Sequence, residues 1–170
     1  SSIVMARLFL VLCCSCYLST ATARPWNTTV NLLDPTRKSL LHPKGRAITA
    51  IVCGTDDSAT SLPLYIFAHG FDCFAPDYEW ICSTPGLVGA IVVSSDFIPF
   101  VPDTKDLALD QAYLSMALPA LAQNQSSPLY ARLSGRAVLG GHSMGGGTSV
   151  LAADPSFATG NISAVALLAP

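Results

Sequence analysis

The sequence predicts an α/β fold in which a mostly parallel sheet carries helices on both faces. Short runs of β-branched and aliphatic residues alternate along the chain with segments whose apolar residues recur at helical spacing. One run, residues 89–93, is Gly-Ala-Ile-Val-Val, and such unbroken apolarity is typical of a strand buried on both faces of a parallel sheet. Strands that alternate with helices form βαβ units, whose right-handed crossovers build such a sheet.

The elements follow a proline-rich start. Residues 24–46 are polar and contain three prolines, so we expect an irregular or edge-strand lead-in. From residue 47 onward the pattern is regular. In the long helix of this region, Asp106 and Asp110 lie near the start and suit the helix dipole. The predicted strands cover residues 47–52, 62–68, 89–93, 136–139 and 164–168, and the predicted helices cover residues 77–83, 105–122 and 145–154.

The first 23 residues are predicted to be a signal peptide. After Met5 and Arg7 comes an apolar run, which ends in the small-residue pattern Ala-Thr-Ala at Ala23. Residues 1–4 precede the expected start and resemble translated upstream sequence. The alternative is a buried N-terminal helix. A signal peptide directs the chain into the secretory pathway, and glycosylation there could use Asn-x-Ser/Thr sites, which stand at Asn27, Asn124 and Asn161.

Composition excludes several functional classes. The chain is 51% apolar, only 12% of its residues are charged, and its formal net charge is −2. With no cluster of Lys and Arg, we expect no nucleic-acid partner. No stretch is long and apolar enough to predict a transmembrane segment. No His/Cys spacing resembles a zinc site, so we expect no metal.

Three cysteines remain once the signal peptide is removed. Cys73 and Cys82 are close enough in sequence to form a disulfide that closes one loop, which an oxidising compartment would permit. Cys53 then either stays buried and free or pairs outside the chain.

The strongest chemical signal is a G-x-S-x-G motif from Gly141 to Gly145, between a predicted strand and a predicted helix. A sharp strand-to-helix turn lifts such a serine clear of the sheet, and glycines let the neighbouring backbone pack closely. Ser143 would then stand at a helix N-terminus, which favours developing negative charge. This motif predicts that Ser143 is a nucleophile. The alternative is a tight turn with an incidental serine.

A second signal is His69-Gly70-Phe71, directly after the strand at residues 62–68. In nucleophile-elbow enzymes the loop after such a strand donates one backbone N–H to the oxyanion, and the residue after the nucleophile donates the other. We therefore assign the oxyanion hole to the amides of Phe71 and Met144. An ordinary strand-ending turn is the alternative for His69 and Gly70.

These motifs resemble the α/β-hydrolases that group chlorophyllases, platelet-activating-factor acetylhydrolases, dienelactone hydrolases and bacterial cutinase-like polyesterases. The resemblance covers residues 47–170 and is strongest to algal-type chlorophyllases. It implies an α/β-hydrolase fold and ester hydrolysis through an acyl-enzyme, with a small-molecule or lipid-like ester as substrate and no cofactor. It is carried by His69-Gly70-Phe71, by Gly-His-Ser-Met-Gly-Gly-Gly from residue 141, by a Trp-containing helix between them, and by the final Ala-Leu-Leu-Ala-Pro.

The remaining triad members are expected beyond Pro170. In this fold the triad follows the order Ser, Asp or Glu, then His, yet after Ser143 the chain offers only Asp154 and no histidine. We expect His142 to pack beside the strand end instead of acting as the base. The chain would then be the N-terminal fragment of a hydrolase, truncated after the strand at residues 164–168 and inactive alone. That strand would be an aggregation-prone apolar edge.

Two further readings stay open. Within the enzyme class, the activity could be that of a secreted cutinase, lipase or acetylhydrolase instead of a chlorophyllase. In another class, the chain could belong to a catalytically dead α/β-hydrolase that serves as a binding module. The signal peptide favours secretion, while an alga with complex plastids could use the same entry for a plastid protein.

Overall fold

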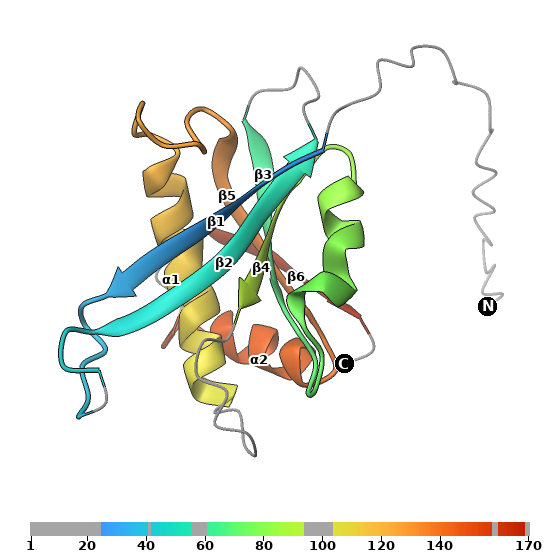
Figure 1. Ribbon diagram of the computed structural model, residues 1–170. Coiled ribbons are helices and arrows are strands. Elements are labelled where there is room, and N and C mark those ends of the chain that lie inside the picture. Colours follow the sequence, from blue (N-terminus) through green and yellow to red (C-terminus); the bar gives the residue numbers. More distant parts are fainter. Residues whose placement is uncertain (1–24, 41, 56–60, 94–103, 158–159, 169–170) are drawn as a thin grey trace, which may run out of the picture.

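The computed structural model describes residues 25–40, 42–55, 61–93, 104–157 and 160–168 (Figure 1). The predicted signal peptide and the final Ala-Pro lie outside these described residues.

The core of the fold is one six-stranded mixed sheet with the strand order β1-β2-β4-β3-β5-β6. The first two pairs, β1 with β2 and β2 with β4, are antiparallel, and the other three pairs are parallel. The strands are β1 (Pro25–Asp34), β2 (Arg46–Thr55), β3 (Leu62–Ala68), β4 (Val88–Val93), β5 (Leu133–His142) and β6 (Ile162–Leu168). The predicted mostly parallel α/β sheet is confirmed.

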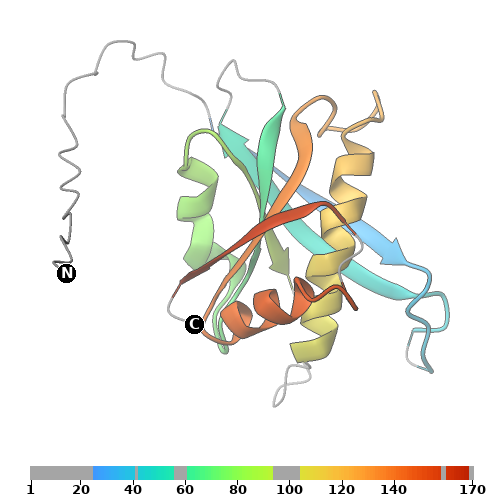
Figure 2. The same cartoon turned by 180° about the vertical axis from the view of Figure 1, so that it is seen from behind.

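Three helices cover the sheet. Helices α1 (Thr104–Leu121) and α2 (Met144–Ala152) lie together on one face, and the 3₁₀ helix η1 (Ala75–Ser83) lies on the other (Figures 1 and 2). Through η1 the chain passes from β3 to its neighbour β4 on one side. Through α1 it then passes back across β3 to β5 on the other side. Because parallel crossovers are right-handed, connections that run in opposite directions must use opposite faces.

Alternating side chains of the strands divide the core between the two faces. In β4, Ala90 and Val92 belong to the larger cluster under α1 and α2, whereas Ile91 belongs to the smaller cluster under η1. Residues 88–92 are all buried, as the unbroken apolar run predicts.

Of the two alternatives for the lead-in, the edge strand is confirmed for residues 25–34. β1 is a regular edge strand whose residues alternate between exposed and half-buried along its antiparallel pairing with β2. Its proline is tolerated because Pro25 is the first residue of an edge strand. Two side-chain contacts hold β1: the Tyr113 hydroxyl donates to the Leu33 carbonyl at 2.9 Å, and the Arg132 guanidinium lies 4.4 Å from the Trp26 ring centre.

The short helix predicted at residues 77–83 begins earlier and is a 3₁₀ helix. Its start is set by a proline in the first turn and by the Asp77 carboxylate, which accepts a 2.8 Å hydrogen bond from the Phe74 N–H. The strand predicted at residues 136–139 extends to Leu133–His142, and the other predicted elements recur with boundary shifts of a few residues at most.

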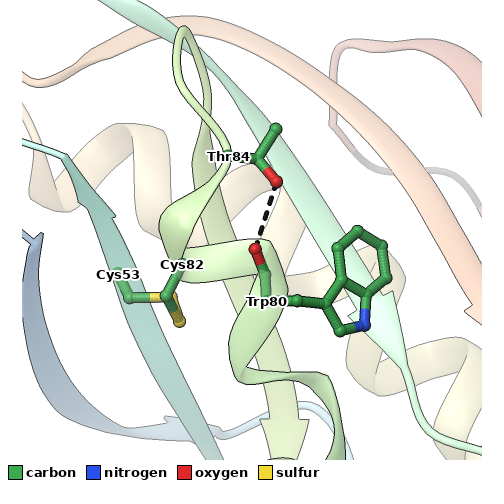
Figure 3. Close-up of a disulfide and its surroundings, with 4 residues drawn as sticks. All are labelled: Cys53, Trp80, Cys82 and Thr84. Atoms are coloured by element: carbon green, nitrogen blue, oxygen red, sulfur yellow. Dashed lines mark hydrogen bonds between the residues drawn. A yellow bond between two sulfur atoms is a disulfide. The ribbon is translucent and has the colours of Figure 1, made fainter.

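The predicted Cys73–Cys82 disulfide is wrong. Cys82 is bonded to Cys53, at a sequence separation of 29, and Cys73 is a free thiol (Figure 3). The packing of η1 over β2 explains this pairing, because the helix brings Cys82 above the buried Cys53, with a Cα–Cα distance of 5.0 Å. Closeness in sequence therefore did not predict the disulfide partner of Cys82. The disulfide attaches η1 to the sheet.

A cluster of charged side chains joins α1 to the start of β2. Asp110 is 2% exposed and accepts hydrogen bonds from Arg37 and, at 3.2 Å, from Arg46. Asp106 binds Arg37 at 2.9 Å. Burial raises the pKa of Asp110, and the two guanidinium groups act against that rise. The cluster, not the helix dipole, accounts for the position of Asp110.

Within the described residues β6 forms one edge of the sheet. Its central residues Ala164–Ala166 are exposed, and Val165 and Leu168 are among the exposed large apolar side chains. An open groove of about 430 Å³ runs along its first half, lined by Ala153, Pro155, Gly160 and residues 162–165.

Candidate active site

The site predicted from the sequence lies where the direction of the chain connections reverses. β3 leads through η1 to β4, while its neighbour β5 leads through α2 to β6 on the other side. In open α/β sheets, ligands bind outside the carboxyl ends of the strands at this type of position. Ala68 pairs with Gly141 there, so the loop after β3 and the turn after β5 begin side by side.

Ser143 occupies the turn between β5 and α2 in a conformation that favours glycine. Its φ is 53° and its ψ is −119°, the dihedral angles of the first central residue of a type II′ turn. A residue with a Cβ is strained there by about 1–3 kcal/mol, and such strain concentrates at functional sites. The Ser143 carbonyl accepts the N–H groups of Gly146 and Gly147, at 2.9 and 3.2 Å, which fixes the turn at the start of α2.

The Ser143 side chain is available for chemistry. The residue is exposed, and its hydroxyl makes no capping hydrogen bond to α2. A serine at a helix N-terminus ordinarily caps the helix through its side chain. The Ser143 hydroxyl instead lies beside the positive end of a helix dipole without a hydrogen bond to any described residue.

Two glycines allow the turn to pack against β3. A Cβ on Gly145 would lie 2.1 Å from the Ala68 carbonyl oxygen, and a Cβ on Gly141 would lie 2.2 Å from the Gly145 carbonyl oxygen. Both distances are far below any real contact, so the first turn of α2 reaches the end of β3 only because these positions lack side chains. This contact brings the Ser143 turn to the loop at residues 69–71.

The amides of that loop and of the start of α2 differ in whether they have a hydrogen-bond acceptor. The Gly70 N–H is already used, because it donates to the Tyr78 hydroxyl at 3.1 Å. The N–H groups of Phe71 and Met144 have no acceptor among the described residues. Phe71 is an exposed residue directly after Gly70, and Met144 is the first residue of α2. Their assignment to the oxyanion hole stays a prediction.

The histidines take other roles. His142 lies beside Tyr78, with 3.0 Å between its Nδ1 and the tyrosine hydroxyl, as expected for packing next to the strand end. His69 is buried, and its Nδ1 is 2.8 Å from the Gly70 carbonyl oxygen. His42 lies in the turn after β1, hydrogen-bonded to Ser39. None of the described histidines is hydrogen-bonded to the Ser143 hydroxyl.

Asp154, the one carboxylate that follows Ser143, is engaged in a local turn. Its Oδ1 accepts hydrogen bonds from the backbone N–H and the hydroxyl of Ser156, which lower its pKa. It is exposed beyond the C-terminal end of α2, at the opposite end of that helix from Ser143.

Sequence reasoning missed a buried amide network beneath the turn. Gln111 of α1 is fully buried, and its Nε2 donates to the Gly140 carbonyl at 3.0 Å and contacts the Ser149 hydroxyl at 3.0 Å. Ser149 in turn donates to the Gly145 carbonyl at 2.8 Å. The network ties α1 to both sides of the Ser143 turn. Spacing could have revealed it, because Gln111 stands at i+4 from Leu107 in the apolar stripe, where a hydrophobic residue is expected.

In the described part of the chain, no helix is long and apolar enough to cross a membrane. In the same residues, no three His, Cys, Asp or Glu side chains are grouped as metal ligands.

Of the comparisons with family models, curated proteins and solved structures, the one with solved structures gave matches. No family model matches the sequence, and no curated protein matches it. Among solved structures, the chain is similar to brefeldin A esterase, described as a bacterial homologue of human hormone-sensitive lipase, with 19% sequence identity and a TM-score of 0.48. The match covers 81% of this chain and 37% of that chain, so this chain spans well under half the length of that protein.

Proposed function

We propose that this chain supplies the nucleophile and the oxyanion hole of a serine carboxylic-ester hydrolase. The observation that carries the proposal is Ser143: a strained, exposed serine at the switch point of the sheet, whose hydroxyl does not cap α2 and whose turn packs against the end of β3. A turn with an incidental serine would have no reason to retain a conformation that glycine adopts without strain.

The proposed reaction proceeds through an acyl-enzyme. The Ser143 Oγ attacks the ester carbonyl carbon, and its proton passes to a histidine that the proposal places beyond Pro170, oriented by an acid in the same region. The amides of Phe71 and Met144 stabilise the carbonyl oxygen as it becomes negative. The C–O bond to the alcohol breaks, and the histidine returns the proton to the departing alcohol. Water then attacks the acyl-enzyme in the same way, releasing the acid and freeing Ser143.

The main test uses the complete polypeptide, expressed with the sequence that follows Pro170 in frame. Ser143→Ala should reduce hydrolysis of p-nitrophenyl butyrate by at least about a thousandfold, because the nucleophile is lost. Ser134→Ala, at an exposed serine at the other end of β5, is the matched control and should leave the rate unchanged. Turnover that survives in Ser143→Ala would remove Ser143 from the mechanism.

The strain is tested by stability in the same polypeptide. Ser143→Gly and Ser143→Ala both lack the hydroxyl, so their difference reports the Cβ alone. Ser143→Gly should be about 1 kcal/mol more stable than Ser143→Ala in urea unfolding, because only glycine adopts this conformation freely. Equal stability, or a more stable alanine variant, would contradict the strained turn.

For the substrate, we propose a chlorophyllase-like ester hydrolysis. A panel of p-nitrophenyl butyrate, p-nitrophenyl palmitate and chlorophyll distinguishes the alternatives through kcat/KM. Preference for chlorophyll supports the proposal, whereas preference for a short or a long acyl ester favours an acetylhydrolase-like or a lipase- or cutinase-like enzyme. An inactive protein that still binds an ester would support the binding-module alternative.

We further propose that the protein enters the secretory pathway. The Cys53–Cys82 disulfide supports this, because disulfides persist in oxidising compartments. All three Asn-x-Ser/Thr asparagines are exposed in the fold. N-terminal sequencing of the exported protein should begin at Arg24, and a protein retaining residues 1–23 would contradict signal cleavage.

A further inference from the structure

We infer that Tyr78 is a positioning residue for the proposed ester hydrolysis, because its hydroxyl joins the loop that carries the Phe71 amide to the strand end that carries Ser143. The inference rests on the proposed function and adds to it a residue that neither motif contains. Tyr78 belongs to η1, which covers the face of the sheet opposite to α1 and α2 (Figures 1 and 2).

The bridge consists of two contacts to one oxygen atom. The Tyr78 hydroxyl accepts the Gly70 N–H at 3.1 Å and lies 3.0 Å from Nδ1 of His142. Gly70 directly precedes Phe71, and His142 directly precedes Ser143. A single side chain thus fixes the residue before the proposed oxyanion donor relative to the residue before the proposed nucleophile.

The Tyr78 side chain is itself held rigidly. It is 6% exposed, and its ring packs against the fully buried Phe67, with 4.7 Å between the ring centres. Four residues further on, Cys82 bonds η1 to Cys53 of β2. A rotamer locked by packing on an anchored helix is what a supporting residue needs, because positional precision at a site depends on such support.

The loop lies so close to the His142 ring that a side chain at Gly70 would displace that ring. A Cβ there would lie 2.7 Å from the His142 Nδ1. The absence of a side chain therefore lets the Gly70 N–H reach the hydroxyl that also contacts His142. The three groups thus join the loop that follows β3 to the end of β5.

The hydrogen-bonding capacities of the three groups match. Burial raises the pKa of Tyr78, so the hydroxyl keeps its proton at neutral pH. Since that oxygen accepts the Gly70 N–H, its own proton is free for a second hydrogen bond. The His142 Nδ1 lies within reach at 3.0 Å, and the Cys73 thiol also interacts with this hydroxyl.

The expected kinetic effect follows from when the oxyanion forms. An amide aimed at the oxyanion stabilises the transition state and contributes little to binding of the neutral ester. If the Gly70–Phe71 segment loses its support, kcat should fall while KM changes little. A defect of folding alone would instead lower the amount of active protein and leave kcat per active site unchanged.

The test compares Tyr78→Phe with Tyr113→Phe in the complete polypeptide. Each variant loses one hydroxyl, and the Tyr113 hydroxyl binds the Leu33 carbonyl between α1 and β1, away from the site. With active sites titrated, Tyr78→Phe should lower kcat for p-nitrophenyl butyrate about tenfold or more and change KM by less than about twofold. Tyr113→Phe should change neither. Equal kcat values in the two variants would overturn the inference.

Amide hydrogen exchange gives a readout that needs no turnover. The Gly70 amide should exchange at least about tenfold faster in Tyr78→Phe and unchanged in Tyr113→Phe, because only the first loses its acceptor. Unchanged protection in Tyr78→Phe would overturn the bridge. Ser143→Ala in the same assays separates the two proposals: turnover independent of Ser143 removes the proposed function, whereas Ser143-dependent turnover that Tyr78→Phe leaves intact removes only the role of Tyr78.

Discussion

Helix α1 carries two adjacent buried polar residues that face two different regions of the molecule. Asp110 faces the edge of the sheet, where it meets Arg37 and Arg46 in a cluster of charges. Gln111 faces the centre of the sheet, where it meets Gly140 and Ser149 in a network of neutral groups. The first network fastens α1 to the lead into β2, and the second lies beneath the Ser143 turn.

The two networks differ in what their loss should affect. Buried charges interact strongly, and removing one partner leaves another charge poorly compensated, so a charged cluster mainly influences global stability. A neutral network contributes less energy, but its donors are directed at particular carbonyl groups and so define local geometry. We therefore expect the charge cluster to affect mainly the free energy of unfolding. We expect the amide network to affect mainly the position of Ser143.

The largest effect should come from Asp110→Ala. Arg37 and Arg46 would lose the buried carboxylate that they share, so the free energy of unfolding should fall by about 3–5 kcal/mol. Asp106→Ala is the matched control: that carboxylate is 44% exposed, and its loss should cost no more than about 1 kcal/mol. Urea unfolding measures both variants, and similar losses would contradict the buried role of Asp110.

An intermediate loss of stability is expected for Gln111→Met, a change that conserves volume. It leaves the Gly140 carbonyl without its side-chain donor, and stability should fall by about 1–3 kcal/mol. In the complete polypeptide its kcat should fall more than that of Asp110→Ala, measured per titrated active site. Gln123→Met, at an exposed glutamine after α1, is the control and should change neither quantity. A Gln111→Met variant with the kcat of wild type would show that the amide network does not influence catalysis at Ser143.

The smallest effect should come from Ser149→Ala, which is expected to cost about 1 kcal/mol or less. The Gly145 carbonyl also accepts a 2.8 Å hydrogen bond from Thr148, so one donor remains when the other is removed. Combining Ser149→Ala with Thr148→Val should then cost more than the sum of the single changes. Additive losses in thermal or urea unfolding would show that the two hydroxyls act independently.

Most elements of the fold were predictable because their causes are local. β3 was predicted with the bounds it has, and α1 and α2 to within two residues, since periodicity and capping act over a few positions. β1 was harder to predict, because three prolines and many polar residues describe an edge strand and an irregular segment equally well.

The candidate site was predictable in part. The G-x-S-x-G spacing indicated a sharp turn at Ser143, and the dihedral angles of that residue agree with it. The spacing marks Gln111 as a polar residue in an apolar stripe, but the partners of Tyr78 and Gln111 could not be assigned, because each contacts residues that are distant in the sequence. No sequence pattern around Tyr78 indicates that its hydroxyl contacts Gly70 and His142.

The sequence by itself determined the positions of most strands and helices and of the sharp serine turn, because each depends on residues within a few positions of one another. Only the tertiary structure decided the partners: Cys53 instead of Cys73 for Cys82, two arginines for Asp110, and the end of β5 for Gln111. These choices depend on which segments the strand order brings together, and that order follows from the packing of the whole chain and not from any local pattern.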